Sequence, residues 1–327
     1  MPGSPRTEDG CLDALWKGVL KIVSISVVGP YDLNLSLRVG SCFSPDPPKD
    51  LHVFRSAVRI NGSPTVLEMR QTRREPPLLE VRTTSADPPS EVKRIARWMI
   101  FAELDLAPFY RLAASHSVLG PITRELDGLK PLRPASLFEM LVIAVTEQQI
   151  SLAAAYRIRT RVTERFGDHV NRLLAFPTPG RLSESSVADL MNCGLSRRKA
   201  EYVKGLASKV ASGQLDLERL ETMPDADVRA LLLQERGLGP WSADYILVRG
   251  LSRPDRVPEN DLGIRSVIGR YLGRGQRLTP QGTMKKLSPF KPYRGLAAFY
   301  MLAYERLSGR SRRMMDSEQT RQERRKS

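Results

Sequence analysis

Apolar and polar positions alternate near the start of the chain, as they do in a β-strand. Residues 20–29 (LKIVSISVVG) alternate closely enough to predict a strand. Residues 31–40 (YDLNLSLRVG) fit either a short helix or an extended segment. We therefore expect extended structure to begin after an N-terminal extension, residues 1–18.

Two further alternating runs, residues 51–60 and 63–72, flank Asn61 and Gly62. A type I′ turn needs positive φ at both central positions, so this pair predicts a β-hairpin. A second turn at RREPP leads into a third run, LLEVRTT. Residues 19–90 are therefore predicted to form a small antiparallel β domain.

From residue 91 onward the apolar spacing becomes helical. One helical face is formed by Val92, Ile95, Ala96, Met99 and Ile100. Amphipathic segments follow at residues 136–148, 151–166, 187–193, 197–212 and 225–235. The pattern predicts an α+β fold with a mostly helical region at 91–308.

The last segment, residues 309–327, has almost no apolar residues. After Gly309 it carries seven basic and three acidic side chains, which predicts a disordered tail. Such a tail either adds nonspecific affinity for DNA or only keeps the protein soluble.

The charge balance of the whole chain favours a polyanionic partner. Lys and Arg number 51 against 36 Asp and Glu, which gives a formal charge of +15. Basic surfaces bind nucleic acid by releasing its counterions, although a solvated basic surface without a partner has the same composition.

The spacing of the cysteines and of the apolar residues narrows the class of protein further. Cys11, Cys42 and Cys193 lie far apart and match neither zinc nor iron–sulfur spacing, which indicates reduced thiols. The chain has no apolar run of membrane-spanning length, and its N-terminus lacks the features of a signal peptide. We expect a soluble, intracellular protein with no membrane association.

The sequence GLGPWSADY, residues 237–245, follows the helical pattern of residues 225–235. It therefore joins two helices, whereas a dinucleotide-binding loop would follow a strand. Pro240 suits the first position of the second helix. The glycines permit a tight turn that exposes backbone N–H groups to a phosphate, and the alternative is a connector that binds nothing.

A second motif lies in PENDLG, residues 258–263, where Asp261 precedes an amphipathic helix. Asp is a favoured N-cap, so capping alone would explain it. Together, GLGPWSADY and PENDLG resemble the helix-hairpin-helix and Gly/Pro-Asp superfamily of DNA glycosylases. The helix-hairpin-helix falls at about residues 225–250 and the aspartate helix at about 258–272.

Within that superfamily the chain looks most like the bacterial 3-methyladenine DNA glycosylase II group. The likeness extends from about residue 20 to residue 308 and includes FEMLVIAVTEQQIS, GLSRRKAEYV and FKPYRGLAAFYMLAY in the order of that group. It implies a mixed antiparallel domain followed by two helical lobes with a cleft between them.

The resemblance implies that Asp261 is the catalytic carboxylate. It would stabilise an oxocarbenium-like sugar and direct the attacking water, with one oxygen capping the helix and the other facing the sugar. Trp241 and Tyr245, four residues apart, would be two walls of the pocket for the flipped base. Without the resemblance they would be ordinary core aromatics. Superfamily members that form a Schiff base carry Lys at the position of Trp241.

Further positions follow from the same resemblance. DNA would be held by Gly237, Leu238, Gly239, Ser242 and Gln149. Gln149 would fill the gap left by the flipped nucleotide, where the bacterial relative has an apolar wedge; alternatively it is a buried amide that ties two helices together. Main-chain carbonyls of Leu233, Glu235 and Leu238 would hold a monovalent cation.

The chain departs from the bacterial relative in the base pocket. Leu262 follows the catalytic Asp, and Leu302 stands where that relative has a tryptophan, so the pocket is less aromatic and its lesion range is open. The four-cysteine cluster of the endonuclease III branch is absent, since no Cys follows Cys193. No iron–sulfur cluster and no required cofactor are expected.

The sequence therefore predicts a monofunctional DNA glycosylase that flips out alkylated purines of the 3-methyladenine and 7-methylguanine type. Its partner would be double-stranded DNA with damaged bases, bound by a monomer. It would act at the nucleoid in a bacterium or in the nucleus in a eukaryote. The alternatives are a noncatalytic helix-hairpin-helix protein that senses damage and a glycosylase for oxidised or deaminated bases.

Overall fold

The computed structural model describes residues 21–41 and 50–309. The predicted N-terminal extension and nearly all of the predicted tail lie outside the described residues, as do Cys11 and Cys42. Three hydrophobic cores organise the rest of the chain: one against a sheet and one in each of two helical lobes.

The N-terminal unit is a four-stranded antiparallel sheet of order β1-β4-β3-β2. Its strands are β1 (Lys21–Ser26), β2 (Val53–Ile60), β3 (Ser63–Arg74) and β4 (Pro77–Thr83). Asn61 and Gly62 join β2 to β3 with φ of 47° and 81°, as a type I′ turn requires. The predicted hairpin is therefore confirmed.

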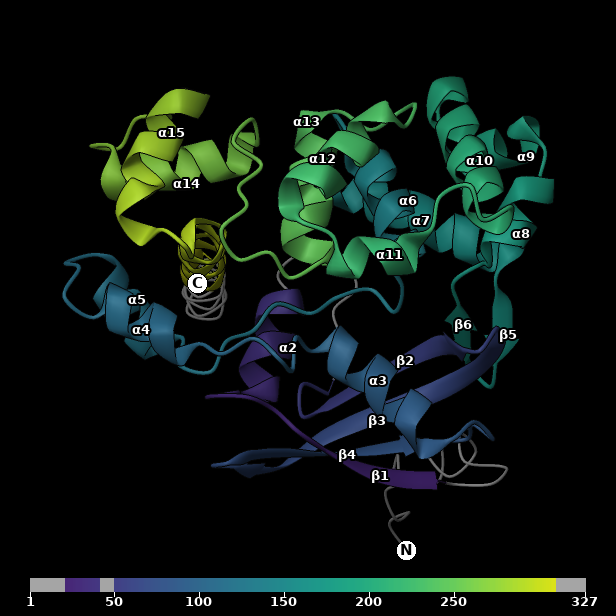
Figure 1. The fold of residues 1–327 in the computed structure, drawn as a ribbon, viewed down its shortest axis with the longest axis horizontal. Helices are drawn as coiled ribbons and strands as arrows, with labels where there is room; N and C mark the ends of the chain where they lie inside the picture. The colour runs from purple at the N-terminus through teal and green to yellow at the C-terminus, as the bar shows by residue number, and fades with distance from the viewer. Residues whose placement is uncertain (1–20, 42–49, 310–327) are drawn as a thin grey trace, which may run out of the picture.

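Two helices complete this unit. The segment left open between helix and strand forms α2 (Leu33–Ser41), and α3 (Pro89–Met99) lies across the sheet (Figure 1). The predicted apolar face of α3 is buried in the sheet core, together with strand residues such as Leu67 and Val81. Residues 89–99 therefore belong with the sheet, and the helical lobes begin after them rather than at residue 91.

The first helical lobe, residues 137–251, contains the predicted helix-hairpin-helix, and we call it the hairpin lobe. Its helices are α6 (Leu137–Glu147), α7 (Leu152–Phe166), α8 (Pro179–Glu184), α9 (Val187–Asn192), α10 (Arg197–Ala211), α11 (Leu217–Thr222), α12 (Asp225–Gln234) and α13 (Pro240–Tyr245). Helix α13 continues into a π-helical turn, η2 (Ile246–Gly250). The predicted helices of this lobe are confirmed to within about one residue at each end.

Hydroxyl and carboxylate caps account for many of these helix starts. At the N-termini of α6 to α10, the N-cap hydroxyl accepts the backbone N–H three residues further on. These N-caps are, in order, Ser136, Ser151, Thr178, Ser186 and Ser196. The N-cap of α13 is Gly239, which has no side chain to offer.

The second lobe contains Asp261, and we call it the aspartate lobe. It combines two early helices with the C-terminal part of the chain: α4 (Ala107–Ala113), α5 (Leu119–Glu125), α14 (Leu262–Leu272), α15 (Pro280–Leu287), η3 (Ser288–Phe290) and a helix over residues 294–309. One core unites them, with Phe109 and Tyr300 in edge contact at 5.0 Å. The two lobes lie side by side above the sheet (Figure 1).

A short hairpin that the apolar pattern did not predict joins the sheet to the hairpin lobe. It consists of β5 (Asp168–Val170) and β6 (Leu173–Ala175). Arg59 of β2 forms an ion pair with Asp168 and donates to the Phe176 carbonyl at 2.9 Å.

Within the described ranges, every helix is too short or too polar to cross a membrane.

Candidate active site

The hairpin between α12 and α13 contains two glycines with different physical roles. Gly237 has φ of 98°, and a Cβ there would lie 2.4 Å from the ring of Tyr202. The fold therefore requires glycine at 237. Gly239 has φ of −102°, and a Cβ there would meet nothing within 4 Å. Packing does not explain glycine at 239, but the close approach of a ligand would.

Gln148 fixes this hairpin to the end of α6. Its Nε2 donates to the Gly237 carbonyl at 2.8 Å and to the Ser242 hydroxyl at 2.9 Å. Ser242 is only 1% exposed and its hydroxyl is engaged by Gln148, so a contact of Ser242 with DNA would go through its backbone, and the contact itself stays a prediction. The amide that ties two helices together is Gln148, whereas Gln149 beside it is exposed, with φ of 56°.

Asp261 lies at the junction of the two lobes. As the N-cap of α14, it accepts the Ile264 N–H through Oδ1 at 2.9 Å. Its Oδ2 accepts the Trp241 indole N–H, also at 2.9 Å, from the hairpin lobe. The second oxygen thus has a protein partner, where the sequence predicted only a sugar; each oxygen keeps a further lone pair for water or substrate.

Trp241 and Tyr245 stack on each other, with ring centroids 4.9 Å apart and planes inclined by 23°. A base does not fit between rings at that distance. The two residues, which the sequence predicted as two walls of the pocket, therefore form one composite wall, which we call the aromatic wall. Both side chains are half-buried on the short helix α13.

Glu147 lies behind this wall, and sequence reasoning missed it. Its Oε2 accepts the Tyr245 hydroxyl at 3.0 Å, and its Oε1 accepts from Arg159 at 2.8 Å. Burial and then the Glu147 charge raise the pKa of Tyr245 far above its usual value. The available signal was a carboxylate in the last turn of an apolar helix, where the helix dipole disfavours a negative charge.

The two leucines of the predicted base pocket differ in exposure. Leu262, directly after Asp261, is 60% exposed, which is unusual for a large apolar side chain. Leu302 is half-buried on the helix over 294–309 and packs against the aspartate-lobe core. Leu262 is thus open to a bound ligand, whereas Leu302 already has protein neighbours.

The three carbonyls of the predicted cation site lie at the end of α12 and in the following turn. Leu233 is in the last turn of the helix, where carbonyls lack an intrahelical partner. The Glu235 carbonyl accepts the Leu238 N–H at 3.1 Å and keeps a second lone pair. A set of neutral oxygens at a helix C-terminus is compatible with a monovalent cation.

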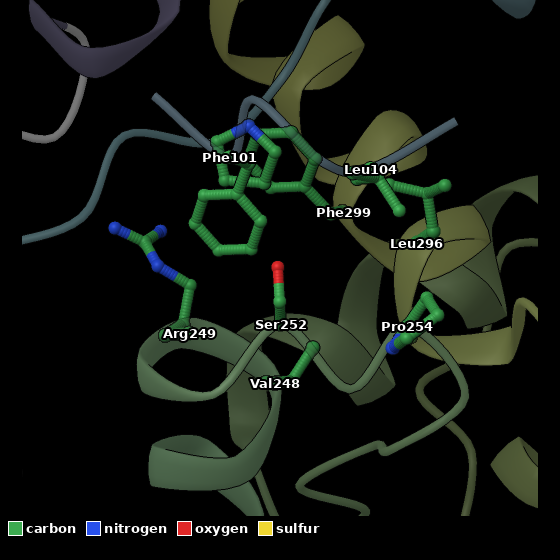
Figure 2. Close-up of a pocket in the computed structure, with 10 residues that line it drawn as sticks. Phe101, Leu104, Val248, Arg249, Ser252, Pro254, Leu296 and Phe299 are labelled. Carbon is green, nitrogen blue, oxygen red and sulfur yellow. The ribbon is translucent and has the colours of Figure 1, made fainter. Parts of the chain in front are cut away.

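A small apolar pocket lies at another junction of the lobes, apart from Asp261 and Trp241 (Figure 2). One side of the pocket is lined by Phe101, Leu104, Leu296 and Phe299, and the other side by η2 and the residues after it.

Arg133 lies next to this pocket, with its guanidinium carbon 4.0 Å from the ring centres of both Trp98 and Phe101. Burial lowers the pKa of Arg133 to about 10. Arg133 also donates to the Gly250 carbonyl at 3.1 Å, so it joins the sheet unit to the hairpin lobe.

The fold and site define a two-lobed helix-hairpin-helix protein with an N-terminal sheet, and comparison with known proteins agrees. Residues 142–292 match the model of the HhH-GPD superfamily base excision DNA repair protein family. A DNA-3-methyladenine glycosylase of Bacillus subtilis is 33% identical over 214 residues, 64% of this chain and 70% of the relative. DNA-3-methyladenine glycosylase 2 of Escherichia coli is 27% identical over 57% of this chain and 64% of the relative.

Solved structures extend this likeness to the sheet. The 3-methyladenine DNA glycosylase from Archaeoglobus fulgidus superposes with a TM-score of 0.76 over 87% of this chain and 98% of that one, at 22% identity, which shows a common fold. A Schizosaccharomyces pombe 3-methyladenine DNA glycosylase bound to abasic DNA gives a TM-score of 0.53 at 25% identity, covering 60% of this chain and 95% of that one. The chain belongs to the HhH-GPD superfamily of base excision DNA repair proteins, and the predicted resemblance is confirmed.

Proposed function

We propose that this protein is a monofunctional DNA glycosylase that removes alkylated purines from duplex DNA by hydrolysing the N-glycosidic bond. The observation that carries the proposal is Asp261, held at the junction of the lobes by Ile264 and by the indole of Trp241. The relatives named as DNA-3-methyladenine glycosylases support alkylated purines as the substrate class.

The chemistry needs a negative charge near the sugar. As the bond between C1′ and the base nitrogen stretches, positive charge develops on the sugar, and the Asp261 carboxylate stabilises it. A water oxygen then bonds to C1′, and its proton passes to the carboxylate. The base departs with the electron pair of the broken bond. A base that alkylation has made cationic leaves as a neutral molecule, so its departure needs less assistance.

A covalent route through an amine does not fit the residues at the hairpin. Trp241 lacks an amine, and so do Pro240 and Ser242 on either side. Two lysines of α10 are engaged elsewhere: Lys199 donates to the Gln148 carbonyl at 2.6 Å, and Lys204 to the Ser185 carbonyl at 2.6 Å. Water is therefore the proposed nucleophile, and the abasic strand stays uncut.

DNA contact is proposed at the hairpin and at Gln149. The open space at Gly239 allows a phosphate to approach the backbone N–H groups. The main-chain carbonyls of Leu233, Glu235 and Leu238 would hold a monovalent cation that bridges to this phosphate. The exposed amide of Gln149 can hydrogen-bond the base left unpaired when its partner flips out.

We propose that the protein acts as a monomer and needs neither an iron–sulfur cluster nor another cofactor. We propose that it acts in the compartment that contains the genomic DNA of its cell.

A panel of duplexes with one defined lesion each tests this proposal. We expect wild type to release 3-methyladenine and 7-methylguanine in single turnover, and to leave undamaged bases in place. Release of only oxidised or deaminated bases would reassign the substrate class. Binding to every lesion duplex without release of any base would contradict an enzymatic role and support a noncatalytic damage sensor.

A further inference from the structure

The two rings of the aromatic wall share an unusual hydrogen-bonding arrangement. Each ring has one polar hydrogen, and each donates it to a carboxylate. The Trp241 N–H goes to Asp261 at 2.9 Å, and the Tyr245 O–H goes to Glu147 at 3.0 Å. The first carboxylate belongs to the proposed reaction, but the second has no part in it.

A hydrogen bond to a carboxylate changes the ring that donates it. Charge-assisted hydrogen bonds are stronger than neutral ones and polarise the donor, so electron density shifts into the π-system. An electron-rich ring attracts a cation over its face more strongly. Since Trp241 and Tyr245 are stacked, the effect on Tyr245 extends to a ligand on either ring. A neutral base gains much less.

The Tyr245 hydroxyl does not require a charged partner at Glu147. A neutral amide or a main-chain carbonyl would satisfy the Tyr245 hydroxyl equally well. Glu147 is instead 8% exposed on its side chain and sits in the last turn of α6, where a negative charge is unfavourable. Arg159 pairs with its other oxygen at 2.8 Å, which offsets the cost of burial but leaves Oε2 directed at Tyr245.

We propose that Glu147 is a specificity-determining residue that acts through Tyr245 to favour positively charged bases over neutral bases of the same shape. The inference rests on the proposed glycosylase function and deepens it. Alkylation at a ring nitrogen of a purine nucleoside creates a fixed positive charge, and Glu147 makes the aromatic wall respond to that charge.

The test uses two duplexes that differ in charge and hardly in shape. One contains 7-methylguanine, a cation, and the other contains 7-deaza-7-methylguanine, its neutral isostere. A 2′-fluorine on both sugars keeps the glycosidic bond intact, so affinity is measured without cleavage. Wild type is compared with Glu147→Gln, Tyr245→Phe and the double variant. Asp189→Asn is the matched control, because it removes another carboxylate paired with an arginine of the same lobe.

We expect wild type and the control to prefer the cationic duplex by about tenfold. Glu147→Gln should reduce that preference about fivefold while its affinity for the neutral duplex changes less than twofold. Tyr245→Phe should do the same, and the double variant should lose no more than either single one, because both act through one hydrogen bond. Equal weakening toward both duplexes would show a merely structural role and overturn the inference.

Failure of the proposed function is measured separately. The cleavable 7-methylguanine duplex is incubated with wild type, and the free base is measured. If no base is released, the glycosylase proposal fails whatever the binding preferences are. If base is released but Glu147→Gln retains the full preference for the cationic duplex, only the inference about Glu147 is wrong.

Discussion

The two halves of the candidate site are held in different ways. The hairpin is fixed within its own lobe by Gln148, by the packing of Gly237 on Tyr202 and by the bond from Tyr245 to Glu147. The start of α14 is more open: Leu262 is 60% exposed, and the Asp261 carboxylate is held by its capping bond and by the Trp241 indole.

This difference separates recognition from chemistry. A rigid hairpin presents its turn and its aromatic wall in fixed positions, which lowers the entropic cost of binding DNA and a flipped base. An accessible carboxylate leaves room for the sugar and for water. Changes in the turn of the hairpin should therefore alter mainly binding, and changes at Asp261 or at its bond from Trp241 should alter mainly the chemical step.

The largest expected effect is at Asp261. Asp261→Asn keeps an oxygen that can cap α14 but removes the charge that stabilises the sugar cation, so single-turnover base release should fall by about a thousandfold. Affinity for a lesion duplex should change little. Release at nearly the wild-type rate would mean that Asp261 is not the catalytic group.

The next effect should be at the turn of the hairpin. Gly239→Asp places bulk and negative charge beside the proposed phosphate, and should weaken binding to damaged and undamaged duplexes about tenfold at moderate salt. Gly180→Asp is the control, because its Cβ also has room and it lies in α8. Unchanged affinity of the Gly239 variant would identify the hairpin as a connector that binds nothing.

Trp241→Phe tests the bond that links the two halves. It keeps an aromatic ring but removes the indole N–H that Asp261 accepts, so base release should slow by about tenfold. Trp98→Phe removes a similar indole bond, 3.0 Å long, to the Pro134 carbonyl, outside the site. That control should lose stability while keeping its rate of release; equal slowing in both variants would argue against a specific role for Trp241.

The smallest expected effect is at Gln148. Gln148→Ala leaves the Gly237 carbonyl and the Ser242 hydroxyl without their partner and should cost about 1–2 kcal/mol of unfolding free energy. Because the turn loosens, affinity for DNA should fall a few-fold. Gln71→Ala removes an amide that donates to the Tyr31 carbonyl at 2.8 Å in the sheet unit, so it should lose stability alone. A Gln148 variant with full affinity would show that the turn needs no tether.

Features encoded by neighbouring residues were predictable from the sequence. Asn61 and Gly62 specify a turn by their own backbone preferences, and the apolar period of residues 91–100 specifies a buried helical face. Asp261 was predicted as an N-cap from its position alone, and the structure confirms it. In each case the signal lies within a few residues of the element.

Features that depend on distant residues were not predictable in this way. The partnership of α4 and α5 with the C-terminal helices arises from one shared core, which no local period encodes. The stacking of Trp241 on Tyr245, and the role of Glu147 behind them, depend on how α6 meets α13. Spacing placed both aromatic rings on one helical face, but it did not show that the two rings stack on each other.

The central claim, hydrolysis without an amine nucleophile, is tested most directly by the products from a single 7-methylguanine duplex treated with borohydride. Strand cleavage by β-elimination requires a Schiff base between an amine and C1′, which borohydride reduces to a stable protein–DNA adduct. We predict free base, an abasic strand that is cut only after alkali or heat, and no adduct. A covalent adduct that forms as fast as the base is released would contradict water, directed by Asp261, as the nucleophile.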